Sequence, residues 1–282
     1  MGCPPACIER LRPATYVTTA HSYGILPASP TNRKEVLFMK ENKYDDNAFF
    51  EKYSQMDRST KGLAGAGEWP TLQRMLPAFD GKRMLDLGCG FGWHCRYAME
   101  QGAASALGVD ISEKMLAVAR EKTTDPRVDY VCAAVEDLEV EPASFDLVIS
   151  SLAFHYIASF PAVCRKVADC LKAGGDFVFS VEHPVFTAYG TQDWYRGENG
   201  AILHWPVDRY FSEGRREAVF LGEQVVKYHK TLTTYLNSLL RTGFVITGIE
   251  EPQPTAEMLR EVPGMEEELR RPMMLIVSAK KQ

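Results

Sequence analysis

Two carboxylates and a short glycine-rich segment are the residues whose spacing in this sequence points most directly to chemistry. Asp86 stands in an apolar run two positions before Gly88, and Gly90 and Gly92 follow at alternate positions. A glycine turn directly after a strand lets a ligand approach the backbone closely, because no bulky side chain intervenes. Asp110 ends the next apolar run, where a carboxylate can accept hydrogen bonds from both hydroxyls of a ribose. The spacing therefore predicts a nucleotide-type site at one edge of a sheet.

The glycine turn alone does not decide which ligand it holds. Dinucleotide enzymes use related turns to hold a pyrophosphate at a helix N-terminus. A carboxylate at Asp86 would repel a pyrophosphate, whereas it suits a cationic amino group. Asp86 and Asp110 together favour a ligand that joins a nucleoside to an amino acid, with a nicotinamide-dependent oxidoreductase as the alternative.

Three further side chains with acid or base chemistry follow later predicted strands. Glu182 and His183 come directly after the predicted fifth strand, and His155 lies just past the fourth. Groups at this edge can take a proton from an oxygen acceptor, so we predict catalytic roles for all three. A purely structural role is the alternative for each of them.

Aromatic residues are the candidates for binding a substrate. Tyr156 follows His155, while Tyr228 and His229 precede a predicted helix, where exposure to solvent is the alternative. Trp194 begins a group of rings that either walls a pocket for a flat or cationic molecule or forms a local core. The other members of this group are Tyr195, His204, Trp205, Tyr210 and Phe211.

The elements that must position these residues alternate between strands and helices. Such alternation predicts parallel strands joined by right-handed crossovers. The predicted strands span residues 83–87, 106–110, 128–132, 145–150, 176–181, 244–250 and 273–279. The predicted helices span 93–101, 112–122, 160–171 and 231–241, with Ser112 as an N-cap, and two more helices with a glycine-rich joint fall within 47–79.

Composition and charge limit the classes of partner. The 282 residues are 45% hydrophobic and 24% charged, with a formal net charge of -5 at pH 7. An acidic chain has no general attraction for nucleic acid or an anionic membrane, and no apolar run approaches the roughly 18 residues that cross a bilayer. We therefore expect a soluble cytoplasmic protein, monomer or homodimer, that acts on a small molecule. The seven cysteines include no CxxC pair, which favours reduced thiols over zinc or redox chemistry, and we predict no metal site.

Four motifs in order resemble those of the class I S-adenosylmethionine-dependent methyltransferases, over roughly residues 45–282. Leu85–Gly92 is similar to the first motif of that family and Asp110 to its ribose-binding acid. Phe145–Ser151 is similar to its fourth-strand motif, and Leu171–Phe177 to its turn into the fifth strand. The resemblance implies an α/β, Rossmann-like fold: a seven-stranded, mostly parallel sheet with helices on both faces and an antiparallel last strand.

The resemblance also implies S-adenosyl-L-methionine as the cofactor. The loop after the third strand holds the adenine in the family, which falls here on residues 133–137. The residues expected to bind the cofactor are Tyr53, Asp86, Gly88, Cys89, Gly90, Gly92, Asp110, Ile111, Met115, Val135, Glu136, Asp137 and Ser150.

These expectations divide the chain into five parts. Residues 39–80 are predicted to form a helical cap, 81–183 the cofactor-binding core, 184–230 an inserted lid after the fifth strand, and 231–282 the rest of the core. The proline-containing stretch 1–38 is predicted to be a non-native or disordered leader, because Lys34-Glu35-Val36 can be encoded by a ribosome-binding sequence just before Met39.

The function predicted from the sequence is methyl transfer to an oxygen or nitrogen atom of a small molecule in a bacterial cell. The alternatives are an RNA or protein methyltransferase, a nicotinamide-dependent oxidoreductase, and a cofactor-binding module without catalysis.

Overall fold

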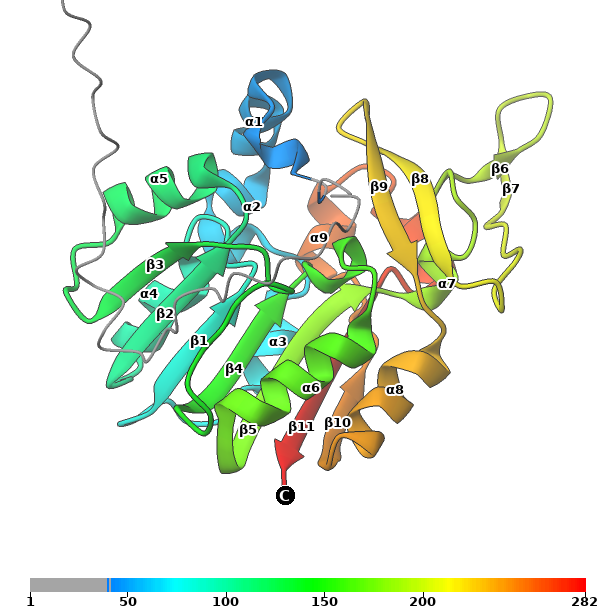
Figure 1. Ribbon diagram of the computed structural model, residues 1–282. Coiled ribbons are helices and arrows are strands. Elements are labelled where there is room, and N and C mark those ends of the chain that lie inside the picture. Colours follow the sequence, from blue (N-terminus) through cyan, green and yellow to red (C-terminus); the bar gives the residue numbers. More distant parts are fainter. Residues whose placement is uncertain (1–39, 41) are drawn as a thin grey trace, which may run out of the picture.

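A computed structural model describes residues 40 and 42–282, so the predicted leader over 1–38 lies outside the described residues. One sheet contains the strands β1 (Arg83–Leu87), β2 (Ser105–Asp110), β3 (Val128–Cys132), β4 (Phe145–Ser151), β5 (Leu171–Glu182), β10 (Phe244–Glu250) and β11 (Met274–Lys281). Their order is β10-β11-β5-β4-β1-β2-β3 (Figure 1). Only β11 runs antiparallel to its two neighbours in this sheet, so the predicted fold and its antiparallel last strand are confirmed.

Helices cover both faces of the sheet because each central strand is apolar on both sides. The helices of the core are α4 (Trp93–Glu100), α5 (Glu113–Lys122), α6 (Phe160–Cys170) and α8 (Leu232–Arg241). Leu85 and Leu87 point to the face covered by α6 and α8, while Met84 points to the opposite face with α4 and α5. The hydroxyl of Ser112 accepts a hydrogen bond from the Met115 N–H at 3.2 Å, which confirms the predicted N-cap.

The N-terminal cap has shorter elements than the two predicted helices. It consists of η2 (Lys43–Asp45), α1 (Asn47–Ser54), α2 (Asp57–Thr60), η3 (Gly62–Gly65) and α3 (Trp69–Met75). Gly62 has a φ of 66°, which an α-helix does not accommodate, so the glycine-rich joint breaks the helical run.

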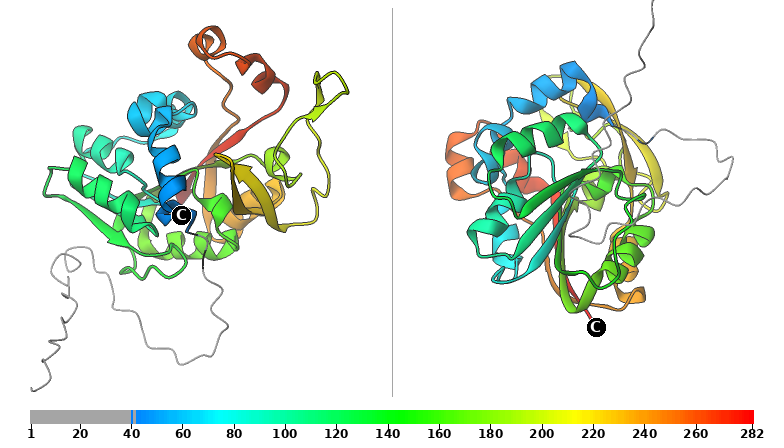
Figure 2. Two further views of the ribbon diagram at one scale, coloured as in Figure 1. Left: turned by 90° about the horizontal axis from the view of Figure 1, so that it is seen from above. Right: turned by 60° about the vertical axis from the view of Figure 1, so that its left-hand side comes forward.

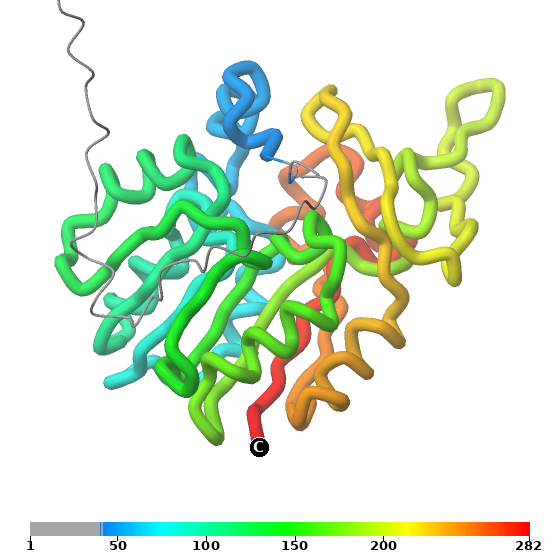
Figure 3. The backbone as a smooth tube through the Cα atoms, in the orientation of Figure 1, coloured from blue at the N-terminus to red at the C-terminus, as the bar shows by residue number. Residues whose placement is uncertain are grey.

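The segment after β5 forms small elements of its own. They are α7 (Pro184–Thr187), β6 (Tyr195–Arg196), β7 (Ile202–His204), β8 (Gly214–Phe220) and β9 (Glu223–His229), while η4 (Phe154–Tyr156), α9 (Ala256–Glu261) and η5 (Met265–Arg270) lie elsewhere in the chain. The β8–β9 hairpin packs Ala218 and Val225 against Phe49 of α1. In Figure 3 α1, this hairpin and the α9 segment lie above the same edge of the sheet. Within residues 40 and 42–282, no helix is both long enough and apolar enough to cross a membrane.

Candidate functional site

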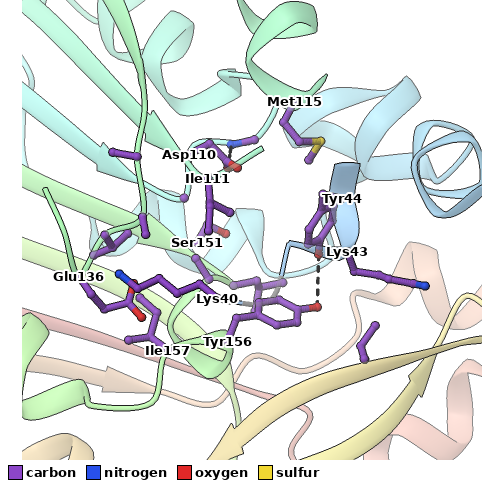
Figure 4. A pocket seen from close by; sticks show the side chains of 18 of the residues that line it. Lys40, Lys43, Tyr44, Asp110, Ile111, Met115, Glu136, Ser151, Tyr156 and Ile157 are labelled. Carbon is purple, nitrogen blue, oxygen red and sulfur yellow. Dashed lines mark hydrogen bonds between the residues drawn. The ribbon is translucent and has the colours of Figure 1, made fainter. Parts of the chain in front are cut away.

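A cavity of about 330 Å³ opens at the carboxyl edge of β1 and β2 (Figure 4). We call it the glycine-turn cavity, since Gly88, Gly90 and Asp110 form part of its wall. The structure brings ten of the predicted site residues together here, from segments that are far apart in the sequence. They are Tyr53, Gly88, Gly90, Asp110, Ile111, Met115, Val135, Glu136, Tyr156 and Tyr228.

The carboxylate of Asp110 is held in one orientation by two backbone donors. Its Oδ2 accepts the Gly90 N–H at 2.8 Å and its Oδ1 accepts the Ser112 N–H at 2.9 Å. Burial raises the pKa of Asp110, although the N–H groups of Ser112 and Gly90 act in the opposite direction. Each carboxylate oxygen has a further lone pair, so Asp110 can also accept two ribose hydroxyls.

Two of the glycines are required for different reasons. Gly88 has a φ of 79°, and a Cβ there would stand 2.4 Å from the Cβ of Ala153. Gly92 has a φ of 72° and is the N-cap of α4, where a Cβ would lie 2.1 Å from the hydroxyl of Tyr130. Gly92 does not line the glycine-turn cavity, so its predicted contact with the cofactor is replaced by a role in the turn.

The prediction that Asp86 contacts the ligand is not supported by the geometry. Residues alternate along β1, so Asp86 points with Met84 beneath α4 rather than into the cavity. Its Oδ2 accepts a weak hydrogen bond from the Cys95 thiol at 3.7 Å, and its Oδ1 has no partner among the described residues. Burial, followed by the charge of Asp110, raises the pKa of Asp86 to about 7.

Two more predicted cofactor residues have structural roles instead. The Ser150 hydroxyl is buried and donates to the Leu87 carbonyl at 2.7 Å, which joins β4 to β1. The side chain of Asp137 is 71% exposed and pairs with Lys40 at 2.5 Å. Neither residue lines the glycine-turn cavity, because one points into the sheet and the other to solvent.

A smaller cavity of about 70 Å³, the Arg58 cleft, adjoins the glycine-turn cavity and is lined by Arg58, Glu68, Ser151 and the predicted residue Cys89. One oxygen of Glu68 accepts hydrogen bonds from the Arg58 guanidinium and, at 3.1 Å, from the Ser151 hydroxyl. The other oxygen, Oε2, is buried without a partner among the residues the structure describes. Sequence reasoning missed Arg58 and Glu68, whose only signal is that they flank the glycine-rich joint.

A third cavity of about 440 Å³ adjoins the glycine-turn cavity, and we call it the Glu182 cavity. Lys227 donates to Glu182 at 2.5 Å and to Gln192 at 2.8 Å, and Gln192 donates to the other oxygen of Glu182 at 2.8 Å. Burial acts to raise the pKa of Glu182, but His155 and Lys227 together lower it below its ordinary value. Lys227 and Gln192 were not predicted from the sequence, because they lie in the inserted segment and meet Glu182 only in the fold.

His155 also lines the Glu182 cavity, but its ring already contacts Glu182. Its Nδ1 accepts the Glu182 N–H at 3.4 Å, which leaves the proton on Nε2, 3.9 Å from Glu182 Oε1. Burial, opposed by the charge of Glu182, lowers the pKa of His155 to about 3. A neutral histidine in this tautomer donates toward Glu182, which favours orientation of the carboxylate over the predicted role as a base.

His183 and His229 lie outside the three cavities, contrary to their predicted roles. His183 Nδ1 accepts the Val185 N–H at 3.0 Å and so caps α7, while Nε2 is 2.8 Å from Glu251. The two ring nitrogens of His229 lie 2.8 Å from the Thr187 hydroxyl and 2.8 Å from the Tyr210 carbonyl. Burial lowers the pKa of both histidines, as expected for neutral rings. His183 joins the start of the insertion to Glu251, and His229 joins two segments within the insertion.

Trp194 is likewise part of a local core and not of a substrate pocket. Its ring packs edge-on against Trp205 at 5.1 Å, and Trp205 stacks on Phe186 at 5.0 Å. The guanidinium of Arg271 lies 4.3 to 5.2 Å from the centres of these three rings. The cation that this aromatic cluster binds is therefore an arginine of the same chain.

The comparisons with known proteins agree with this geometry. Residues 85–179 match a family model described as a methyltransferase domain. A structure from Listeria monocytogenes, described as an S-adenosylmethionine-dependent methyltransferase, is 57% identical with a TM-score of 0.75 and covers 78% of this chain and 99% of that one. A second, from Mesorhizobium loti, is 47% identical with a TM-score of 0.73 and covers 78% of this chain and 100% of that one. The chain belongs to the S-adenosylmethionine-dependent methyltransferases.

Among the curated relatives, one matches this chain over most of its length and another over about a third of it. An uncharacterised Haemophilus influenzae protein is 34% identical over 253 residues, which are 86% of this chain and 98% of that protein. A ubiquinone biosynthesis O-methyltransferase from Idiomarina loihiensis is 38% identical over 103 residues, only 36% of this chain and 42% of that enzyme.

S-adenosyl-L-methionine is thus the cofactor, which rules out the nicotinamide alternative, and the enzyme is a methyltransferase rather than a silent binding module. The residues fit this cofactor: Asp110 keeps free lone pairs at the cavity, and Gly88 leaves no room for a side chain at the turn. When bound, the cofactor supplies a methyl group on a positively charged sulfur.

Proposed function

We propose that this enzyme transfers a methyl group from S-adenosyl-L-methionine to an oxygen or nitrogen atom of a small molecule held in the Glu182 cavity. One observation carries the proposal: the Glu182 cavity and the glycine-turn cavity share part of their walls. The shared residues are Tyr44, Tyr53, Arg58, Leu152 and Tyr156. An acceptor in one cavity is thereby placed directly next to a cofactor in the other.

The size and walls of the Glu182 cavity suit a small organic acceptor. Its volume of about 440 Å³ falls in the range of small-molecule sites. Phe220 and Lys227 of the β8–β9 hairpin form part of its wall, and Glu223 at the hairpin tip pairs with Lys52 of α1 at 3.1 Å. We propose that the insertion, through this hairpin, acts as a lid that separates the acceptor from water.

Methyl transfer from a sulfonium needs alignment and removal of water more than acid or base chemistry. The Tyr44 and Tyr156 hydroxyls, 3.3 Å apart, stand in the shared wall and can orient an acceptor. Glu182 is an anion in a buried setting, so it can take the proton that an O–H or N–H acceptor loses. Lys227 and Gln192 fix the position of this carboxylate through hydrogen bonds of 2.5 and 2.8 Å.

An RNA or protein methyltransferase is the remaining alternative. Such an enzyme would need unpaired cations at the mouth of the site, but the basic residues in the wall of the glycine-turn cavity are paired. Lys40 pairs with Asp137, Lys43 with Glu223 at 3.5 Å, and Arg58 with Glu68. The partial match to O-methyltransferases of ubiquinone biosynthesis also supports a small-molecule acceptor.

A panel of metabolites incubated with S-adenosyl-L-methionine tests the proposal, with release of S-adenosylhomocysteine as the readout. At least one small hydroxyl or amine compound should be methylated, and Glu182→Gln should slow that reaction. Methylation of RNA or protein with no turnover of any small molecule would contradict the proposal.

A further inference from the structure

A groove of about 350 Å³ lies beside the Glu182 cavity, under the C-terminal segment that carries α9 and η5. We call it the methionine groove, because four of the chain's eleven methionines form its wall, together with Pro252, Pro254 and Pro263. The four are Met258, Met265, Met273 and Met274, all half-buried. Methionine side chains are flexible and polarisable, so they adapt to irregular apolar ligands. In Figure 2 (left) this segment projects away from the helices that cover the sheet.

The methionine groove is continuous with the proposed acceptor site. Gly67, Glu68, Met273 and Met274 line both the groove and the Glu182 cavity. Met274 on β11 is the register partner of Glu182 on β5. Neighbouring strands lie about 4.8 Å apart, so the backbone of Met274, which lines the groove, lies one strand spacing from that of Glu182.

The charges in the wall of the groove are neutralised by this chain. Glu268 pairs with Arg271 at 2.6 Å, and Glu68 pairs with Arg58. The remaining wall consists of methionines, prolines, glycines and Gln253. This surface suits a hydrocarbon better than a charged or strongly polar group.

We propose that the acceptor is amphipathic, with its reactive oxygen or nitrogen beside Glu182 and a hydrocarbon chain in the methionine groove. This inference rests on the proposed function and names its substrate class. Gly67, which lines both cavities, lies close to Met258, since a Cβ on Gly67 would stand 3.1 Å from the end of that side chain. A larger residue at position 67 would press against Met258 at the point where the two cavities meet.

The test uses three phenols that differ only in the length of a para-alkyl chain: 4-methylphenol, 4-butylphenol and 4-octylphenol. Each is titrated calorimetrically into the full protein saturated with S-adenosylhomocysteine. One buried methylene group improves affinity by about fourfold at most. We expect 4-butylphenol to bind at least about tenfold more tightly than 4-methylphenol, in line with three further methylene groups at partial burial.

The variants Met258→Glu and Met265→Glu should remove this gain while leaving the affinity for 4-methylphenol within about twofold. Met258→Leu keeps an apolar wall and should retain the gain. Val262→Glu is the matched control for added charge, because Val262 lies in the same segment, is 42% exposed and does not line the groove. Thermal unfolding without ligand checks that each variant is folded.

No dependence on chain length in the wild type, or the same dependence in the glutamate variants, would overturn the inference. The metabolite panel separates this from a failure of the proposed function. Turnover of small acceptors with no advantage for a hydrocarbon chain overturns the inference alone. Chain-length dependence that needs Met258 and Met265, combined with methylation of macromolecules only, overturns the proposed function.

Discussion

Replacing Asp110 by alanine should weaken the binding of S-adenosylhomocysteine by about 10- to 150-fold. Both carboxylate oxygens are fixed by backbone N–H groups at 2.8 and 2.9 Å and keep lone pairs for the two ribose hydroxyls. Loss of these two hydrogen bonds costs about 1.5–3 kcal/mol in total, and each 1.4 kcal/mol is about tenfold in affinity.

Isothermal titration calorimetry with two ligands makes this test specific. Methylthioadenosine has the same ribose but lacks the amino-acid end, so Asp110→Ala should weaken both ligands by the same factor. Asp137→Ala is the control, because Asp137 is an exposed acid outside the cavity wall and should leave both affinities within about twofold.

The substitution also affects the free protein, because the N–H groups of Gly90 and Ser112 lose their acceptor. Each donor left unpaired costs about 1–3 kcal/mol of unfolding free energy, so Asp110→Asn, which keeps one acceptor oxygen, serves as a milder second variant. Affinities within about threefold of wild type for both ligands would refute the assignment of Asp110 to the ribose. A loss for S-adenosylhomocysteine alone would place Asp110 at the amino-acid end instead.

Three further outcomes follow from the site. Arg58→Gln and Glu68→Gln should each weaken S-adenosylhomocysteine by about tenfold or more without changing methylthioadenosine, since the ribose acid Asp110 does not line the Arg58 cleft. Arg74→Gln, at an exposed position of α3, is the control, and equal losses for both ligands would contradict this assignment. Glu182→Gln should lower kcat at least about tenfold with S-adenosylhomocysteine affinity within about twofold, so unchanged kcat would exclude a role in proton removal. In the folded protein His155 has a pKa of about 3, below its ordinary value of 6.5. Between these two pH values the unfolded chain binds a proton at His155 that the native protein does not bind. The free energy of unfolding therefore falls as the pH drops from about 6.5 toward 3. His155→Asn should therefore reduce the slope of the unfolding free energy against pH, between pH 6 and 4.5, by up to about 1.4 kcal/mol per pH unit. Chemical denaturation at a series of pH values measures this slope. An unchanged slope would mean that His155 is protonated in the native protein.

Much of the fold could be predicted because its elements are specified by local patterns. β1, β3 and β10 begin and end at the predicted residues, and the Ser112 cap falls at the predicted start of α5. The N-terminal cap was predicted less well, because its short helices depend on packing against the β8–β9 hairpin rather than on a continuous apolar face. The hairpin itself was predicted only as an insertion.

The residues of the candidate site also fall into those that local sequence patterns specify and those that depend on packing. The sequence alone determined Gly88, Gly90 and Asp110, because the end of a strand and a glycine turn place these residues at the sheet edge whatever the rest of the chain does. It could not determine where the side chain of Asp86 points: alternation along β1 puts Asp86 on the same face as Met84, but only the packing of α4 shows that this face lies beneath that helix.

Only the tertiary structure decided which polar residues meet. Glu182 and Lys227 are 45 positions apart, and Arg58 and Ser151 reach the same buried carboxylate of Glu68 from different elements. His183 and His229 have the same residue type as His155, yet neither lines the three cavities: His183 contacts Val185 and Glu251, and His229 contacts Thr187 and Tyr210. Residue type and spacing specify local backbone geometry, whereas a pocket for an acceptor arises where distant segments pack, and no local pattern records that packing.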